Sequence, residues 1–301
     1  MTVTATAPGK IVLAGEYAVL WGAPAVCIAV NRRAVVTVGD SRDGKCRVRT
    51  PGFAGDDRFS VIDAVTGGNR PARDIELDTT AFSENGRKTG IGSSAAVTVA
   101  LAAAIGNTID VYDEALAAHS RLQGGKGSGI DVAAAVHGGL FEFTPGGNEV
   151  KMLQWPAGLA FRVIWTGVSV STTAKIDQLA HQAKKASRSA LLLAAPRIRD
   201  AWCLGDADVI LSEYVTYIGV LRQFSVDHDL GIFDAGHDEL TDAAMVDGLV
   251  YKPAGAGGGD IGVLFGRDEA ELDAFVERRA DMIHGVLPCE PDPDGVRLEP
   301  R

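Results

Sequence analysis

Hydrophobic residues near the start of the chain fall into short, β-branched runs that are separated by glycine, proline and polar residues. Ile11–Leu13, Ala25–Val30 and Ala34–Val38 have this pattern, which predicts strands. The segment Gly39–Lys45 then reads G-D-S-R-D-G-K and is followed by a further strand-like run, Arg47–Arg49. Strand patterns on both sides predict that this segment is the loop of a β-hairpin.

Longer patterns with a helical period follow. Ser94–Ile105 is apolar on nearly all sides, which predicts a buried helix. Val111–Gln123 is amphipathic and has Asp113 and Glu114 in its first turn, as the helix dipole favours. Helices are also predicted over Ile130–Val136, Lys175–Ala195, Ala207–Phe224 and Asp268–His284.

Short strand patterns separate these helices. They predict a hairpin from Leu140–Phe143 to Glu149–Met152 and strands over Phe161–Trp165 and Ile261–Phe265. Gly295–Leu298 is a candidate for a last edge strand. Because strands cluster and then helices cluster, the pattern favours an α+β fold over a parallel α/β sheet.

The composition is that of an ordinary globular protein. The 301 residues, 46% hydrophobic and 23% charged, can build one large domain or two modest ones. The net charge of −10 argues against a general nucleic-acid or anionic-membrane binder. The four cysteines are scattered, which is typical of free thiols in a reducing, cytoplasmic compartment. Neither a signal peptide nor a membrane span is expected.

The most informative segment for function is Lys88–Ala95, which reads K-T-G-I-G-S-S-A and is called the phosphate loop below. It opens directly onto the apolar run Ala96–Ile105. Backbone N–H groups, two hydroxyls and the positive end of a helix dipole would meet there, as polyphosphate binding requires. It is not a Walker A loop, because no G-x-x-x-x-G-K-[ST] string precedes it. Gly-Ser turns also begin many ordinary helices, so the segment alone leaves both readings open.

Two further segments change that balance. Ala7–Leu20 reads A-P-G-K-I-V-L-A-G-E-Y-A-V-L, and Lys252–Asp260 reads K-P-A-G-A-G-G-G-D. With the phosphate loop, and in this order, they resemble the motifs of the GHMP kinases, which phosphorylate small metabolites with ATP. The resemblance spans almost the whole chain. It implies two α+β halves, an ATP-binding half over residues 1–160 and a ferredoxin-like half over residues 161–301, with the active site in the cleft between them.

The resemblance implies ATP and Mg²⁺ as cofactors and assigns roles in the phosphate loop. Lys88 would pair with ATP phosphates and assist catalysis, and the Ser94 hydroxyl would be a Mg²⁺ ligand. The residues expected to contact ATP are Lys88, Gly90, Ile91, Gly92, Ser93, Ser94 and Ala95.

The resemblance also implies an acceptor site. Lys10 would neutralise charge on the acceptor and the transition state, with Glu16 and Tyr17 nearby, although Glu16 could instead be a structural partner of a cation. The run Gly255–Gly259, the glycine loop below, would close near the acceptor and the phosphates. The expected acceptor-binding residues are Lys10, Glu16, Tyr17, Lys126, Gly127, Ser128, Asp131, Gly255, Ala256, Gly257, Gly258 and Gly259.

Asp131 ends the string G-S-G-I-D and has two possible roles. It could simply cap a helix. By resemblance to the mevalonate kinase branch it would be the catalytic base, which an alcohol acceptor needs. A phosphate monoester, with a second pKa of about 6, is already mostly dianionic at pH 7 and needs cations instead.

Four details resemble phosphomevalonate kinases more than mevalonate kinases. They are Tyr17, Gly127, Asp260, and Trp165–Gly167 followed by Ser171–Thr173. The expected reaction is therefore phosphorylation of 5-phosphomevalonate to 5-diphosphomevalonate. The short chain and Ile91 in place of the usual Leu depart from that branch.

Alternatives remain open. They are mevalonate, another small alcohol or a phosphorylated or phosphonate metabolite as acceptor, and a non-catalytic metabolite sensor. Arginines that grip the acceptor phosphate are expected among Arg32, Arg188, Arg197 and Arg199. The protein would be a monomer or a homodimer.

Overall fold

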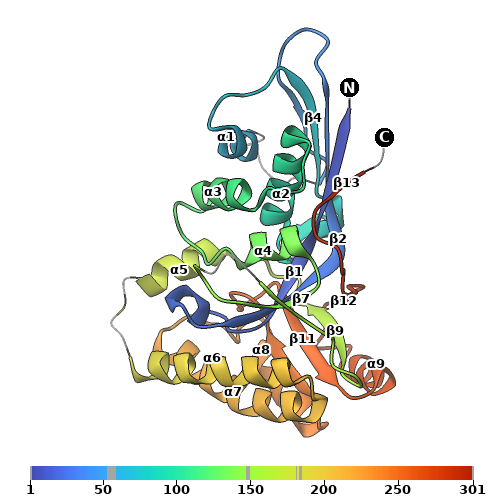
Figure 1. Ribbon diagram of the computed structural model, residues 1–301. Coiled ribbons are helices and arrows are strands. Elements are labelled where there is room, and N and C mark those ends of the chain that lie inside the picture. Colours follow the sequence, from blue (N-terminus) through green and yellow to red (C-terminus); the bar gives the residue numbers. More distant parts are fainter. Residues whose placement is uncertain (1, 53–58, 147–149, 181, 183–184, 300–301) are drawn as a thin grey trace. The chain divides into compact units, whose positions relative to one another are not determined.

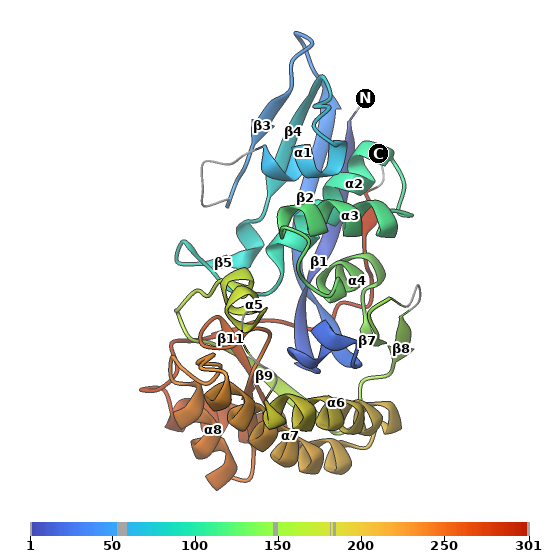
Figure 2. The ribbon, with the colours of Figure 1, turned by 90° about the vertical axis from the view of Figure 1, so that its left-hand side faces the viewer.

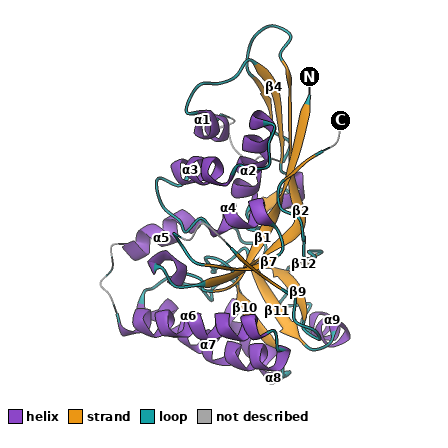
Figure 3. Ribbon diagram, in the orientation of Figure 1, coloured by secondary structure: helices purple, strands orange, loops and turns teal. Residues whose placement is uncertain are grey.

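The structure is a computed structural model that describes residues 2–299 except 53–58, 147–149, 181 and 183–184. Helices and strands both occur along the chain, which confirms the α+β prediction (Figure 3). Among the described residues, no helix is long and apolar enough to cross a membrane.

The chain forms two compact units, and neither is one continuous stretch. Unit 1 contains Met1–Ile11, Ile28–Gly139 and Glu290–Arg301, and unit 2 contains Val12–Cys27 and Leu140–Cys289. The chain thus leaves unit 1 twice and returns to it near its C-terminus. The two compact units have different limits from the predicted domains, residues 1–160 and 161–301. Those domain limits, which were based on the family resemblance, stay a prediction.

Unit 1 is built on strands in the order β13-β1-β2-β4-β3. Their bounds are β1 Val3–Ala14, β2 Ala25–Asp40, β3 Arg47–Arg49, β4 Arg73–Asp78 and β13 Arg297–Leu298. β13 pairs antiparallel with β1, which confirms the predicted last edge strand. The two separate strands predicted over Ala25–Val30 and Ala34–Val38 are one continuous strand, β2, whose later residues alternate between buried and more exposed positions as a one-sided strand should.

The hairpin predicted around Gly39–Lys45 is wrong. β2 pairs antiparallel with β4, and β3 pairs parallel with the other edge of β4. β4 therefore lies between β2 and β3 in the sheet, and the loop at Gly39–Lys45 connects two strands that are not neighbours. β4, which comes later in the chain and has the alternating pattern of Arg73–Asp78, takes the place beside β2 because its buried Ile75 and Leu77 face the core.

Four helices accompany this sheet: α1 Ser60–Thr66, α2 Ser93–Gly106, α3 Tyr112–Leu122 and α4 Ile130–His137. Figures 1 and 2 show α1, α2 and α3 on one side of strands β1, β2 and β4. α2 is buried from Ala95 to Ala104, as its apolar sequence predicted, and its many alanines allow neighbouring helices to approach closely. The predictions for α3 and α4 are also confirmed within a residue or two.

Arg33 on β2 fastens the returning C-terminal segment to unit 1. Its guanidinium forms an ion pair with Asp292 (2.6 Å) and donates to the backbone oxygens of Asp294 (3.1 Å) and Gly295 (2.6 Å). The same group donates to the side-chain and backbone oxygens of Thr6 on β1. One side chain therefore ties β1, β2 and residues 292–295 together.

Unit 2 contains a four-stranded antiparallel sheet in the order β10-β11-β9-β12. The bounds are β9 Ala160–Trp165, β10 Val250–Pro253, β11 Ile261–Gly266 and β12 Gly285–Leu287. β7 Leu140–Phe143 and β8 Lys151–Leu153 form the predicted antiparallel hairpin, whose residue Glu149 lies outside the described residues. β7 also pairs with β2, so the hairpin belongs to the same sheet as β2. The predicted strands at Phe161–Trp165 and Ile261–Phe265 are confirmed.

The helices of unit 2 are α5 Thr172–Ala180, α6 Ala186–Leu204, α7 Ala207–Asp227, α8 His237–Val246 and α9 Glu269–Arg278. The single helix predicted over Lys175–Ala195 is wrong, because α5 ends at Ala180 and α6 begins only at Ala186. Lys185, the N-cap residue of α6, has an extended backbone and so interrupts any continuous helix. The helix predicted to reach His284 ends at Arg278, where β12 must soon begin.

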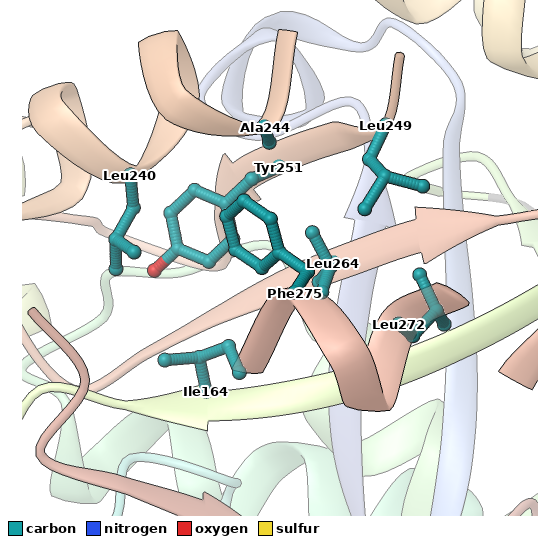
Figure 4. Packing of buried hydrophobic residues seen from close by; sticks show 8 residues of the cluster. All are labelled: Ile164, Leu240, Ala244, Leu249, Tyr251, Leu264, Leu272 and Phe275. Carbon is teal, nitrogen blue, oxygen red and sulfur yellow. The ribbon is translucent and has the colours of Figure 1, made fainter. Parts of the chain in front are cut away.

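One hydrophobic core cluster of unit 2 lies where β9, β10 and β11 meet α8 and α9 (Figure 4). Its buried residues are Ile164, Leu240, Ala244, Leu249, Tyr251, Leu264, Leu272 and Phe275. α8 contributes Leu240 and Ala244 and β10 contributes Tyr251, although the sequence patterns did not predict either element. The core holds β10 and β11 in place, and the glycine loop connects these two strands.

Candidate active site

The phosphate loop of unit 1 leads directly into α2. Gly90 and Gly92 have φ values of +79° and +89°, and Gly92 is the N-cap residue of α2. A Cβ on Gly92 would lie 3.0 Å from Cγ of Lys10. Glycine is needed at this position both for its left-handed backbone and to let the Lys10 side chain pass.

The first turn of α2 has the features that phosphate binding requires. The N–H groups of the first residues of a helix have no partner inside the helix and carry the positive end of its dipole. Ser94 is exposed in this turn, while Ile91 and Ala95 are buried and anchor it. Lys88 lies exposed on β6 (Arg87–Lys88), which pairs with β5 (Ser83–Glu84). These residues fit a polyphosphate anion.

Lys10 and Asp131 meet beside this helix start. Lys10 Nζ lies 3.5 Å from Asp131 Oδ1, and the side chains are 11% and 29% exposed. The backbone N–H of Lys10 donates to the Ile91 oxygen (2.8 Å), which joins β1 to the phosphate loop. Lys10, Asp131 and the phosphate loop, which are far apart in the sequence, are therefore brought together within unit 1.

Asp131 does not cap α4. The N-cap residue is Gly129 (φ +84°), and the Ser128 hydroxyl accepts a hydrogen bond from the Ile130 N–H (3.3 Å). Asp131 lies in the first turn of α4, where its negative charge interacts favourably with the helix dipole and its Oδ1 lies close to Lys10 Nζ. Lys126 and Gly127 lie just before, in the connection from α3, and Gly127 also has a positive φ. The capping role that the sequence left open is thereby excluded for this aspartate.

His119 on α3 is a neighbour of this pair that the sequence patterns did not single out. Its side chain is buried, and among the described residues its Nε2 has no hydrogen-bond partner. Burial lowers the pKa of His119; the Asp131 carboxylate raises it and the Lys10 ammonium lowers it. The imidazole is therefore held neutral next to a charged pair.

The four arginines expected to grip the acceptor phosphate have different surroundings. Arg32 pairs with Glu84 (3.1 Å), Arg197 with Glu213 (3.2 Å), and Arg199 with Glu142 and Asp200. The guanidinium of Arg188 lies over the ring of Trp21, 3.7 Å from its centre. Three of the four thus already have carboxylate partners, and which of them binds an acceptor stays a prediction.

In unit 2, Glu16 is buried and its two carboxylate oxygens have different partners. One forms an ion pair with Lys252 Nζ, and the other accepts a hydrogen bond from the Tyr217 hydroxyl (2.8 Å). The side chains of Lys252 and Glu16 are 0% and 2% exposed. Burial lowers the pKa of Lys252, and the Glu16 carboxylate opposes this. The geometry favours the structural role for Glu16, so it is not carried into the proposed acceptor site.

Tyr17 follows Glu16 with an unusual backbone. Its φ is +59°, a region that bulky residues rarely adopt. Its hydroxyl donates to the Ala256 oxygen in the glycine loop (2.6 Å), and its ring packs against Phe224. Burial, and the nearby Glu16 carboxylate, raise the pKa of Tyr17. The strained residue thus connects the N-terminal segment of unit 2 to the glycine loop.

The glycine loop joins β10 to β11, of which only β11 was predicted from the sequence. Gly255, Gly257 and Gly258 have φ between +64° and +74°, and the Gly259 oxygen accepts a hydrogen bond from His237 Nε2 (3.0 Å). The Tyr251 hydroxyl bonds the other ring nitrogen of His237 (2.8 Å), and burial lowers the pKa of His237 to about 4. A neutral histidine therefore anchors one end of the loop.

No group of three or more His, Cys, Asp or Glu side chains in the described part of the chain is arranged to hold a metal ion. Mg²⁺ commonly binds nucleotide phosphates with only one or two protein ligands. The exposed Ser94 at the start of α2 fits such a site, and its role as a ligand stays a prediction.

Comparison with known proteins identifies the family. The GHMP kinases N terminal domain matches residues 64–139, which include the phosphate loop and Asp131. The phosphomevalonate kinase of Streptomyces sp. (strain CL190) is 30% identical over 360 residues, covering 95% of this chain and 96% of that protein. The chain belongs to the GHMP kinases. This GHMP kinase is accordingly a phosphotransferase that uses ATP.

Other proteins similar to this GHMP kinase include both a mevalonate kinase and a phosphomevalonate kinase. The mevalonate kinase of Archaeoglobus fulgidus is also 30% identical, over 310 residues that cover 98% of this chain and 99% of that protein. Streptococcus pneumoniae phosphomevalonate kinase, solved in complex with phosphomevalonate and AMPPNP, has a TM-score of 0.81 at 19% identity, with 97% and 99% of the chains covered. This structural likeness confirms the GHMP kinase fold.

Proposed function

We propose that this GHMP kinase transfers the γ-phosphoryl group of ATP to the phosphate of 5-phosphomevalonate and produces 5-diphosphomevalonate. The contact of Tyr17 with Ala256 in the glycine loop is the observation that carries this choice. The phosphomevalonate kinase branch is expected to have tyrosine at this position, where mevalonate kinases usually have histidine. The hydroxyl is used by the loop backbone, so this position supplies neither a base nor a cation to an alcohol acceptor.

The charges in unit 1 suit a phosphate acceptor. The acceptor is mostly dianionic at pH 7, so it does not need to lose a proton in order to attack. It does need cations to reduce its repulsion from the γ-phosphate. Lys10 lies on β1 beside the start of α2, where its ammonium could supply such a charge, and the Asp131 carboxylate lies 3.5 Å from this ammonium.

The bond changes follow from this arrangement. The N–H groups of the first turn of α2, together with Lys88, would hold the triphosphate. Mg²⁺, with Ser94 as a proposed ligand, would neutralise phosphate charge. An acceptor oxygen forms a bond to the γ-phosphorus, the bond from that phosphorus to the β-phosphate oxygen breaks, and ADP leaves.

A coupled assay of ADP release tests the proposal directly. Purified protein with Mg-ATP is given 5-phosphomevalonate or mevalonate in parallel reactions. Turnover on 5-phosphomevalonate and none on mevalonate is the expected result. Turnover on mevalonate alone would make the protein an alcohol kinase, and ATP binding without turnover on either would support a metabolite sensor.

Mevalonate kinase is the second candidate, because the Archaeoglobus enzyme is as similar in identity as the Streptomyces one. The two candidates differ in what they ask of Asp131. In an alcohol kinase its carboxylate would be the general base, whereas with a phosphate acceptor it positions Lys10.

A further inference from the structure

The glycine loop is packed on the backbone of two other segments of unit 2. The Gly258 N–H donates to the Ile232 oxygen (2.7 Å), and the Asp260 N–H donates to the Val168 oxygen (2.6 Å). A Cβ on Gly257 would lie 2.5 Å from the Ile232 oxygen, and one on Gly259 would lie 2.7 Å from the Val168 oxygen. The conformation of the loop therefore depends on where these two segments lie.

Side chains from α5 and the residues after it hold the first of these segments. Lys175 Nζ donates to the oxygens of Leu230 (2.7 Å) and Gly231 (3.2 Å). Gln178 Nε2 donates to the Asp229 oxygen (2.5 Å), and Gln182 Nε2 to the His228 oxygen (2.7 Å). Four successive carbonyls, of residues 228–231, thus receive hydrogen bonds from this side.

Lys175 is the member of this set that also reaches the glycine loop. Its Nζ lies 2.3 Å from the place where a Cβ of Gly258 would be, so the ammonium rests against the loop backbone. Two of its three N–H bonds serve the carbonyls of residues 230 and 231. Burial lowers the pKa of Lys175, while the carboxylates of Asp234 and Asp260 oppose this.

These bonds are important because α5 has little apolar contact with the rest of unit 2. Leu179 is the one buried residue of this helix. Hydrogen bonds from a charged donor are stronger than those between neutral groups. Lys175 is therefore the strongest polar attachment in this set.

We propose that Lys175 is a positioning residue for the glycine loop: it fixes residues 230–232 and, through them and Gly258, the conformation that the loop presents to the acceptor. The link to the acceptor rests on the proposed function, whereas the link to the loop rests on the contacts alone. Loss of Lys175 should impair use of the acceptor and leave the KM for ATP unchanged, because the phosphate loop belongs to unit 1.

The test compares Lys175→Met with Gln178→Met. Lys175→Met removes two hydrogen bonds between α5 and the 228–231 segment and Gln178→Met removes one, but only Lys175→Met also removes the contact with Gly258. For Lys175→Met we expect kcat/KM for the acceptor to fall about 10–100-fold with an unchanged KM for ATP, since small misplacements near reacting groups have effects of this size. Gln178→Met should change kcat/KM by less than about threefold.

Hydrogen–deuterium exchange of the amides in residues 253–262 gives a readout that does not depend on activity. These amides should exchange at least about tenfold faster in Lys175→Met than in the wild type or in Gln178→Met. Equal exchange in all three proteins would overturn the positioning role, as would faster exchange with the acceptor kinetics unaltered. If the wild type turned over no acceptor, the proposed function would fail while the exchange experiment still decided the role of Lys175 in the loop.

Discussion

The buried pair of Glu16 and Lys252 allows a stability prediction with a defined magnitude. Lys252→Met replaces the lysine with an apolar side chain of similar length and leaves the Glu16 carboxylate in a site that is 2% exposed. The Tyr217 hydroxyl would then be its remaining hydrogen-bond donor among the contacts described. Removing one partner of a buried ion pair costs about 3–5 kcal/mol, because the other charge loses its compensation without regaining water.

Tryptophan fluorescence during urea unfolding measures this loss. The four tryptophans, Trp21, Trp155, Trp165 and Trp202, all belong to unit 2, which also contains the ion pair. The signal therefore reports the free energy of unfolding of the relevant unit. In a thermal scan the same loss would lower Tm by roughly 6–20 °C, at about 2–4 °C per kcal/mol for a protein of this size.

Two controls separate the cost of the uncompensated charge from other effects. The double variant Glu16→Gln with Lys252→Met removes both charges and should recover most of the lost stability. Arg267→Met breaks an exposed pair with Asp208 and should change stability by less than about 1 kcal/mol. A loss below about 1 kcal/mol for Lys252→Met, or no recovery in the double variant, would refute the reasoning.

Three other predictions follow from the site. Burial lowers the pKa of His237 to about 4 in the folded protein, whereas the unfolded chain has the ordinary value near 6.5. The free energy of unfolding should therefore keep its full value above pH 6.5 and fall by about 3 kcal/mol as the pH is lowered to 4. Urea unfolding at a series of pH values should show this fall, and His237→Gln should reduce it. Gly92→Ala should raise the KM for ATP at least about tenfold, because its Cβ would press on Lys10 and its φ is +89°; an unchanged KM contradicts the assignment of the phosphate loop. Asp131→Asn should lower kcat with 5-phosphomevalonate by less than about 100-fold, whereas a loss of about 10³–10⁴-fold would indicate a general base.

Local patterns were sufficient for the segments that are predicted to bind phosphate and for some of the elements around them. The apolar run after the phosphate loop became α2 because alanine favours helices and buries well. The glycine loop was expected to lead into a strand, and β11 follows it in the structure, whereas β10 before it was not expected. In these segments the secondary structure depends on residues that are close in the sequence, so sequence patterns can predict it.

Long-range partners were not predictable in the same way. The position of β4 between β2 and β3 depends on partners that are 27 or more residues apart in the sequence, for which no local turn exists. The apolar neighbours of Lys252 in its strand were the only feature of the sequence that indicated its burial. Its ion-pair partner, Glu16, is 236 positions away and could not be predicted from them. Lys175 gave no signal, because its partners are backbone carbonyls, which every residue has.

The return of residues 290–301 to unit 1 sets the order in which the two units can be completed during synthesis. When the ribosome has added residue 289, every residue of unit 2 exists, but unit 1 still lacks β13 and three of the residues that Arg33 binds, Asp292, Asp294 and Gly295. Unit 2 can therefore finish folding first, although most of unit 1 is made before it. A chain that stopped at Cys289 would contain a complete unit 2 and an unfinished unit around Lys10, Asp131 and the phosphate loop. A chain truncated after Cys289 should thus keep a folded unit 2 and lack kinase activity.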